Sequence, residues 1–258
     1  LGREAYENVS ALGLETTYLQ WDDSNTTGTV KVSFDEQNNP DYVIIPHVAY
    51  DHIQATDSFL EIAAAADCIY FGTLSQRFDR SRKTLKLLLE RSPASLKFCD
   101  INLRKKCYTR ETVVFSLEEA DVLKMNEQEA RGLARILDIS QQSIPRFCEE
   151  ILNRYSLRYC LVTLAEKGAF VLSGNGEKIY VPGYNIELED SLGAGDAFSA
   201  GFIHEILRGA TVAEACGLGN IMGALVAAQR GATSGVAQEE MNRLIKDDTE
   251  RNVHPEFE

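Results

Sequence analysis

The sequence predicts an α/β fold, a three-layer sandwich around a mostly parallel central sheet, with a small β-strand appendage. From about residue 52 onward, short apolar runs alternate with amphipathic stretches of helical length, which is typical of βαβ units whose strands are buried on both faces. The first fifty residues differ, because apolar and polar residues alternate there as in a two-faced strand. With 258 residues, 44% of them hydrophobic, the chain can bury the core of one main domain.

The alternating segment predicts the appendage. In GTVKVSF, residues 28–34, Val30, Val32 and Phe34 alternate with polar residues, and DEQNNPDYVII then supplies a turn and a second short strand. We therefore expect an antiparallel hairpin. The β-strand appendage is assigned to residues 15–46, and the α/β core to residues 1–14 and 47–258.

Four apolar runs predict the core strands: CIYFG (68–72), LKFCD (96–100), VLKMN (122–126) and YCLVT (159–163). Ligands of open α/β sheets bind beyond the carboxyl ends of the strands, so the polar residues after each run are candidates for a site. They are Asp100, Asn102 and Arg104; Asn126 and Glu129; Glu166, Lys167 and Gly168; and the turn Gly193 to Asp196. Each has a structural alternative: Asn126 and Glu129 have the spacing of a helix N-cap box, and Asp100 could cap a turn. Their convergence on one sheet edge favours a binding site.

Composition excludes several classes of protein. The net charge of -13 argues against nucleic acid and anionic membranes as partners. The six cysteines form no C-x-x-C pair and are expected to be free thiols in a reducing cytosol. Since no apolar run approaches the ~20 residues of a membrane span, we expect a cytoplasmic protein. The C-terminal stretch KDDTERNVHPEFE is expected to be solvated and loosely held.

Common site motifs are also missing from the sequence. There is no G-x-x-x-x-G-K-[ST] loop, no complete dinucleotide fingerprint and no histidine cluster for zinc, and Ser191 lacks a nucleophile elbow.

The stretch LEDSLGAGDAFSAGF, residues 188–202, places Asp196 directly after a Gly-Ala-Gly turn and before an apolar helical pattern. A helix entry exposes N–H groups and positive partial charge, which suits a phosphate. A carboxylate at that point either caps the helix or does chemistry beside the phosphate.

This stretch resembles the signature D-T-x-G-A-G-D-x-F-x-A-G-F of the PfkB, or ribokinase-like, carbohydrate kinases, and the resemblance extends over nearly the whole chain. Other segments resemble further family motifs in the same order: TTGTVKVSFDE and PHVAYDHI the lid region of fructokinase-like members, GTLSQR the G-[ST]-L strand end, FCDINLR the D-x-N-x-R segment, KMNEQEA the N-x-x-E motif, and AAQRGAT the late nucleotide-site turn.

Two features depart from the family. Ala165 replaces the first glycine of V-T-x-G-x-x-G. The opening LGREAYENVSALGLETTYLQ resembles a stretch that lies inside other members, so their early Gly-Gly segment and the preceding Asp are absent from the sequence given. We expect an unrecorded N-terminal portion, the alternative being a protein without those first strands.

The resemblance implies a role for each matching residue. Asp196 is the expected catalytic base, and the N–H groups of Gly193, Ala194 and Gly195 form the expected anion hole. The remaining roles are Asn102 and Arg104 toward the substrate; Asn126 and Glu129 organising Mg²⁺ and the phosphates, Glu129 through water; Thr163, Gly168, Asn220 and Gly231 along the adenine nucleotide; and Asp190 and Gly231 at a K⁺ ion.

By the same resemblance we expect an ATP-dependent sugar kinase that phosphorylates a primary hydroxyl, with fructose as the first choice and 2-keto-3-deoxygluconate or ribose behind it. The resemblance also implies a ribokinase-like fold in which the appendage, residues 15–46, is a lid that would exclude water and clasp a second copy in a homodimer. A nucleoside kinase and a catalytically silent binding protein on the same fold stay open as alternatives.

Overall fold

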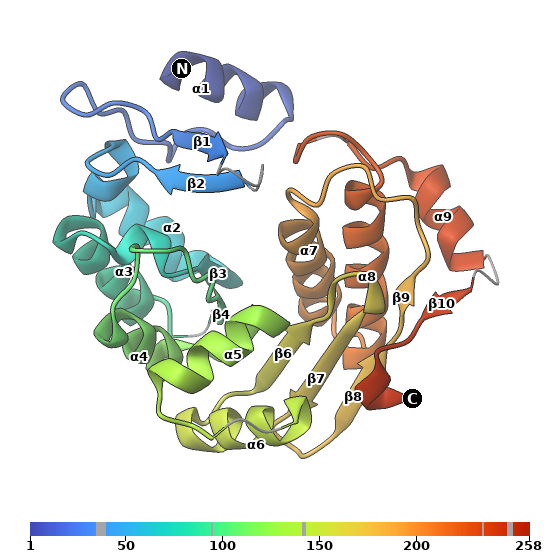
Figure 1. Cartoon of the computed structure of the whole chain (residues 1–258). Coiled ribbons are helices and arrows are strands. Elements are labelled where there is room, and N and C mark those ends of the chain that lie inside the picture. The colour runs from blue at the N-terminus through green and yellow to red at the C-terminus, as the bar shows by residue number, and fades with distance from the viewer. Residues whose placement is uncertain (35–39, 94, 141–142, 234, 247–249) are drawn as a thin grey trace. The chain divides into compact units, whose positions relative to one another are not determined.

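The computed structural model describes residues 1–34, 40–93, 95–140, 143–233, 235–246 and 250–258. The chain divides into two compact units (Figure 1). Unit 1 comprises residues 1–69, 73–95 and 104–112, and unit 2 comprises residues 70–72, 96–103 and 113–258. Among the described residues, no helix is both long and apolar enough to cross a membrane.

Unit 1 contains the strand pair predicted for the lid. Its elements are α1 (Gly2–Ala11), β1 (Val30–Phe34), β2 (Pro40–Ile44), η1 (Ala49–His52), α2 (Asp57–Ala65), η2 (Leu74–Gln76) and α3 (Asp79–Arg91). β1 and β2 are antiparallel, with Val30 opposite Ile44. The connecting turn, 35–39, lies outside the described residues. The side chains of Val30 and Val43 are 53% and 47% exposed, so the strand pair offers apolar surface.

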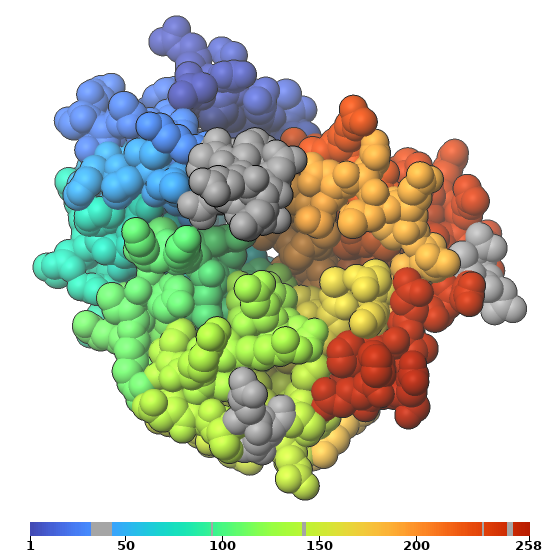
Figure 2. Space-filling model, viewed as in Figure 1, coloured from blue at the N-terminus to red at the C-terminus, as the bar shows by residue number. Residues whose placement is uncertain are grey.

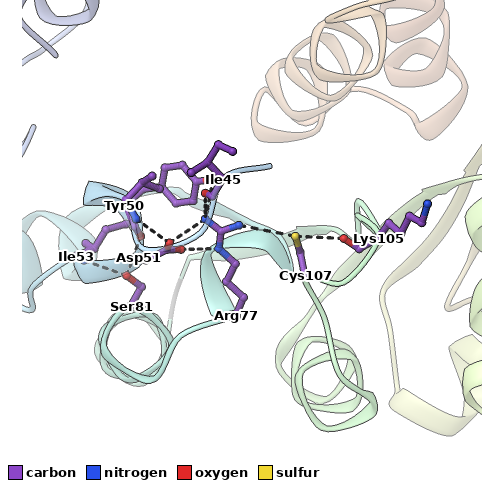
Figure 3. Close-up of polar contacts among 9 residues, drawn as sticks. Ile45, Tyr50, Asp51, Ile53, Arg77, Ser81, Lys105 and Cys107 are labelled. Carbon is purple, nitrogen blue, oxygen red and sulfur yellow. Dashed lines mark hydrogen bonds and ion pairs between the residues drawn. The ribbon is translucent and has the colours of Figure 1, made fainter. Parts of the chain in front are cut away.

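A buried ion pair organises unit 1 (Figure 3). Nε and Nη2 of Arg77 donate to the two carboxylate oxygens of Asp51 at 2.7 and 2.8 Å, and Nη2 also donates to the carbonyl of Ile45 at 2.8 Å. Asp51 is fully buried. Ser81 of α3 donates to the carbonyl of Tyr50, also at 2.8 Å. The planar fork of an arginine fits such a bidentate contact, and it ties the segment after β2 to the start of α3.

Unit 2 contains most of the α/β sandwich. Its elements are β4 (Leu96–Asp100), β5 (Val122–Asn126), α5 (Glu127–Ile136), α6 (Ile144–Tyr155), β6 (Tyr159–Thr163), η3 (Ala165–Lys167), β7 (Ala169–Ser173), β8 (Lys178–Val181), β9 (Gly183–Tyr184), α7 (Ala194–Leu207), α8 (Val212–Ala227), α9 (Gln238–Lys246), β10 (Arg251–Asn252) and η4 (Pro255–Phe257). Two elements run from unit 1 into unit 2: β3 (Cys68–Phe71) and α4 (Arg110–Glu119).

The central sheet has six strands in the order β3-β4-β5-β6-β7-β8. β4, β5 and β6 are parallel, whereas β7 and β8 each run antiparallel to the preceding strand. In Figure 1, α5 and α6 cover one face of β5, β6 and β7, and α7 and α8 lie on the other face of the sheet. The three-layer α/β fold is therefore confirmed, with a mixed sheet whose parallel part is made by predicted strands.

Burial differs between the central and the edge strands. β4 to β6 are almost wholly buried, as their apolar runs predict, and β7 is buried throughout. β3 is an edge strand, and the side chain of its Tyr70 is 47% exposed. The expectation that all four predicted strands are buried on both faces is wrong for β3, because the face that carries Tyr70 is not fully covered by another layer.

The C-terminal residues that the structure describes are docked on unit 2, which corrects the expectation of a loosely held tail. The ring of Phe257 stacks on Tyr180 with 4.4 Å between centroids. The N–H of Ile144 donates to the carboxylate of Glu256 at 2.8 Å. Residues 250–258 therefore form part of the surface of this unit (red in Figure 2). Aromatic stacking at this distance stabilises the contact beyond the burial of area.

Candidate active site

The Gly-Ala-Gly-Asp turn forms the start of α7. Gly193 is the residue before the helix and has φ +82°, a conformation that favours glycine. A Cβ there would lie 2.9 Å from the carbonyl oxygen of Ala232, so the backbone also needs the space. The N–H of Ala194 donates to the carbonyl of Ser191 at 3.3 Å. Because the first N–H groups of a helix have no partner within it, this end of α7 can receive an anion.

Asp196 is the third residue of α7 and is exposed. Its carboxylate does not cap the helix, since Gly193 occupies the N-cap position. The hydrogen bond that the structure gives it comes from the hydroxyl of Tyr70, 3.2 Å from Oδ1. The carboxylate therefore lies at the open end of the helix, where a ligand can reach it.

A buried charge pair lies behind this turn. Nζ of Lys124 donates to Oδ2 of Asp100 at 2.6 Å, and both side chains are almost fully buried. The same ammonium donates to the carbonyl of Gly195 at 3.3 Å. The hydroxyl of Tyr70 is 3.0 Å from Oδ2 of Asp100. Burial, and then the carboxylates of Asp100 and Asp196, raise the pKa of Tyr70 far above its usual range, so its hydroxyl stays protonated.

Asn126 and Glu129 form the helix cap that their spacing allows. The N–H of Glu129 donates to Oδ1 of Asn126 at 2.8 Å, and the N–H of Asn126 donates to Oε2 of Glu129 at 2.9 Å. Oε1 of Glu129 accepts from the N–H of Leu103 at 3.0 Å. Burial is the main cause that raises the pKa of the Glu129 carboxyl. In the part of the chain that the structure describes, no group of three histidine, cysteine or acidic side chains is placed to hold a metal ion.

The structure brings together the two loops expected at a K⁺ ion. The N–H groups of Glu189 and Asp190 donate to the carbonyl of Ala227 at 2.9 and 3.2 Å. Oδ2 of Asp190 accepts from the N–H of Gly231 at 3.3 Å, and Oδ1 accepts from Leu192 at 2.9 Å. Asp190 therefore joins the loop before α7 to the loop after α8.

The other nucleotide candidates lie around the ends of β6 and β8. The hydroxyl of Thr163 donates to the carbonyl of Met125 at 3.4 Å. The amide of Asn220, which is buried, donates to the carbonyls of Val181 and Pro182 at 3.0 and 3.3 Å. A Cβ on Gly168 would lie 2.0 Å from the same Val181 oxygen. Asn220 thus fixes the backbone that Gly168 packs against.

Ala165 lies in the left-handed region, with φ +53°. This is the position where the family signature has glycine, so the turn keeps a conformation that suits glycine and strains alanine. Of the two substrate candidates, Asn102 follows β4 within unit 2, whereas Arg104 is exposed and belongs to unit 1. Their contact with a substrate stays a prediction.

Sequence reasoning missed Tyr70 and Lys124. The signal for Lys124 is a lysine inside the otherwise apolar strand VLKMN, because a buried cation needs a nearby anion. Tyr70 gives no such signal, since an aromatic residue is ordinary in a strand.

Comparison with known proteins decides the family. Residues 1–239 match the model of the pfkB family carbohydrate kinase. The chain belongs to the PfkB family. It is therefore a phosphotransferase that acts on sugars.

Several PfkB relatives span most of the chain. A putative sugar kinase, PH1459, of Pyrococcus horikoshii is 26% identical over 93% of this chain and 75% of its own length. A 2-dehydro-3-deoxygalactonokinase of Haloferax volcanii is 23% identical over 95% of this chain and 78% of its own length. A fructokinase of Escherichia coli is 25% identical over 74% of this chain and 62% of its own length.

Solved structures have the same PfkB fold. The crystal structure of PH1459 has a TM-score of 0.79 at 24% identity and covers 96% of this chain and 78% of that one. A fructokinase with bound ATP from Xylella fastidiosa has a TM-score of 0.82 at 18% identity and covers 95% of this chain and 81% of that one.

Proposed function

We propose that this protein transfers the γ-phosphate of ATP to a primary hydroxyl of a sugar, with fructose as the favoured acceptor. The observation that carries the proposal is the position of Asp196. Its carboxylate is exposed at the open N-terminus of α7, and Gly193 rather than Asp196 occupies the N-cap position. A base and a phosphate-binding turn then stand side by side.

In the proposed reaction, Asp196 accepts the proton of the sugar hydroxyl. The oxygen bonds to the γ-phosphorus, and the bond from that phosphorus to the bridging oxygen breaks, so that ADP leaves with the electron pair. The N–H groups of Gly193, Ala194 and Gly195 stabilise the charge on the transferring group. The N–H of Ala194 would donate to both the phosphate and the carbonyl of Ser191, because its hydrogen bond to that carbonyl is long, at 3.3 Å, and therefore weak.

ATP as the donor is supported by similar structures: those of PH1459 and of the X. fastidiosa fructokinase were solved with ATP. We propose that Thr163, Gly168 and Gly231 line the nucleotide pocket. Asn220 would shape the pocket through the two carbonyls that its amide holds.

The hydrogen bonds of Glu129 are compatible with binding a Mg²⁺ ion through a bridging water molecule. Each of its carboxylate oxygens accepts one backbone N–H and keeps capacity for a water molecule, and Asn126 caps the same helix. Bound Mg²⁺ would neutralise phosphate charge and retain several of its waters. Glu129 and Asn126 would orient those waters beside the phosphates.

We also propose that Asp190 and Gly231 contribute oxygen ligands to K⁺. Their two loops already meet through the Gly231 N–H and the Asp190 carboxylate, and carboxylate and carbonyl oxygens suit a hard cation. Rates should be higher in K⁺ than in tetramethylammonium at matched ionic strength. Equal rates would contradict this part of the proposal.

The acceptor is tested with a panel of sugars and nucleosides, assayed by ADP release. Fructose is expected to give the highest kcat/KM, followed by 2-keto-3-deoxygluconate and ribose. Relatives bear different substrate names, among them fructokinase and 2-dehydro-3-deoxygalactonokinase, so the panel decides between real alternatives. Preference for a nucleoside would indicate a nucleoside kinase, and no sugar-dependent turnover would indicate a silent binding protein.

The residues proposed to bind the sugar are Asn102 and Arg104. We further propose a homodimer formed through the lid, residues 15–46, because Val30 and Val43 of its strand pair are exposed. Sedimentation equilibrium of the wild type and of a Val30→Lys variant tests the dimer. A monomeric wild type would overturn it.

The catalytic role is tested with Asp196→Asn, which keeps the size of the side chain and removes its proton affinity. Loss of a general base lowers kcat by ~10²- to 10⁴-fold, while ATP binding and the melting temperature should stay close to those of the wild type. Glu205→Gln makes the same chemical change at the other end of α7 and should leave kcat unchanged. Activity of Asp196→Asn within about threefold of the wild type would rule out the base, given the lower limit of that range.

A further inference from the structure

We propose that Tyr70 is a positioning residue that keeps the Asp196 carboxyl group in place by hydrogen bonding to it before and after it takes up a proton. This inference rests on the proposed role of Asp196 as the base. It concerns a residue that neither the family signature nor the predicted site includes.

The geometry gives one hydroxyl two acceptors. The Tyr70 oxygen is 3.2 Å from Oδ1 of Asp196 and 3.0 Å from Oδ2 of Asp100. A tyrosine hydroxyl has one proton to donate, and ionised carboxylates only accept. At any moment the proton can point fully at only one of the two carboxylates, so the direction of the Tyr70 hydrogen bond depends on the other partners of these carboxylates.

While Asp196 is ionised, Lys124 sets the direction of the Tyr70 hydrogen bond. Its ammonium is 2.6 Å from the same Asp100 oxygen, and the two side chains are only 7% and 6% exposed. This short charge-assisted hydrogen bond compensates the charge of Asp100 without the tyrosine. The Tyr70 proton is then available to Asp196, whose carboxylate forms no ion pair with a lysine or arginine among the residues that the structure describes. The Lys124 ammonium instead donates to the carbonyl of the preceding Gly195 at 3.3 Å.

The direction reverses when Asp196 has taken the sugar proton. We place the sugar proton on Oδ1, the oxygen that lies 3.2 Å from the Tyr70 hydroxyl, so that the new O–H can donate to the Tyr70 oxygen. The tyrosine hydroxyl rotates about its C–O bond and donates to Asp100 at 3.0 Å. No proton leaves Asp196 in this step. The carboxyl group therefore keeps the same partner in the same place through both halves of the reaction.

The ring of Tyr70 can be kept while its hydroxyl is removed. It stacks against Phe98 with 5.7 Å between centroids, and the side chain is 47% exposed, so Tyr70→Phe retains the packing and should fold. Tyr155→Phe, at the end of α6, makes the same change away from Asp196 and is the matched control.

The experiment measures kcat, the KM for ATP, the KM for the sugar and the melting temperature of Tyr70→Phe, alone and combined with Asp196→Asn. Alone, it should lower kcat about tenfold, the lower end for a hydrogen bond to a charged group because Asp196 is exposed. Both KM values and the melting temperature should stay near those of the wild type. In the Asp196→Asn background it should lower kcat no further, since the two side chains act as one unit. Tyr155→Phe should behave as the wild type.

The outcomes separate the two claims. If Asp196→Asn is inactive and Tyr70→Phe keeps kcat within twofold of the wild type, the inference is overturned and the proposed function stands. An equal fall in kcat in both backgrounds, or a fall that follows a lower melting temperature, shows a merely structural tyrosine and also overturns it. If Asp196→Asn is fully active, the proposed base itself is wrong.

Discussion

Gly193→Ala tests whether the turn before α7 needs glycine for space as well as for conformation. The residue has φ +82°, and an added Cβ would lie 2.9 Å from both the Cβ and the carbonyl oxygen of Ala232. Real Cβ atoms essentially never approach another atom so closely, and one of the two contacts is backbone, so the loop after α8 would have to move.

The two costs can be added. A positive φ costs an alanine roughly 1–2 kcal/mol. Forcing a methyl group into packed structure costs about 1–3 kcal/mol more. We therefore expect Gly193→Ala to lower the free energy of unfolding by about 2–5 kcal/mol. It should also lower kcat, because the displaced turn carries Asp196.

Gly209→Ala separates these costs. Gly209 has nearly the same dihedral, φ +81°, but no atom lies within 4 Å of the position of its Cβ. Urea unfolding should show a loss of only about 1–2 kcal/mol for this variant, with kcat unchanged. Equal losses for the two variants would refute the argument from space and leave the dihedral as the sole reason for glycine.

Three further changes test other parts of the molecule. Hydrogen bonds from the hydroxyl and N–H of Thr211 hold the pKa of Glu214 below its ordinary value of 4.5. A carboxyl pKa that is lowered by folding adds stability at pH values above 4.5, and this stability is lost as the pH falls through the pKa of the folded state. Glu214→Gln should therefore be less stable than the wild type at pH 7, and the two should converge in urea unfolding under acid conditions; a constant difference would contradict this. Arg77→Met leaves the buried carboxylate of Asp51 unpaired and should cost about 3–5 kcal/mol, part of which Arg77→Met/Asp51→Leu should restore, whereas no recovery would argue against the ion pair as the cause. Ala165→Gly relieves an alanine at φ +53° and should stabilise the protein by up to about 1 kcal/mol; a lower melting temperature would show that the strain is absent.

The parts of the fold that sequence predicts are those with a local signal. β4, β5 and β6 lie at the residues of their apolar runs, because a strand buried on both faces needs nearly continuous apolar side chains. β7 and β8 were not predicted, although β7 is wholly buried, because they are added by tight connections rather than by helical crossovers. The antiparallel half of the sheet therefore falls outside the βαβ pattern.

The candidate site also has residues that the sequence predicts and residues that it does not. The Gly193 to Asp196 turn is visible in the sequence because glycines, an acid and a helical pattern stand together. The contacts of Tyr70 with Asp100 and Asp196 join residues far apart in sequence, so no periodicity reports them. The same holds for Asp51 and Arg77, which form the buried ion pair of unit 1. Such partners become evident only in the three-dimensional structure.

Because α8 packs against α7, substitutions in α8 can disturb the site. A Cβ on Gly223 of α8 would lie 3.1 Å from the carbonyl oxygen of Ala194, in the turn that precedes Asp196. Gly223 has no side chain to bind or react, yet any larger residue there would press on the backbone of that turn. Sequence change at this distant helix position is therefore constrained by the turn's geometry, and an inactive natural variant could carry every residue of the site unaltered.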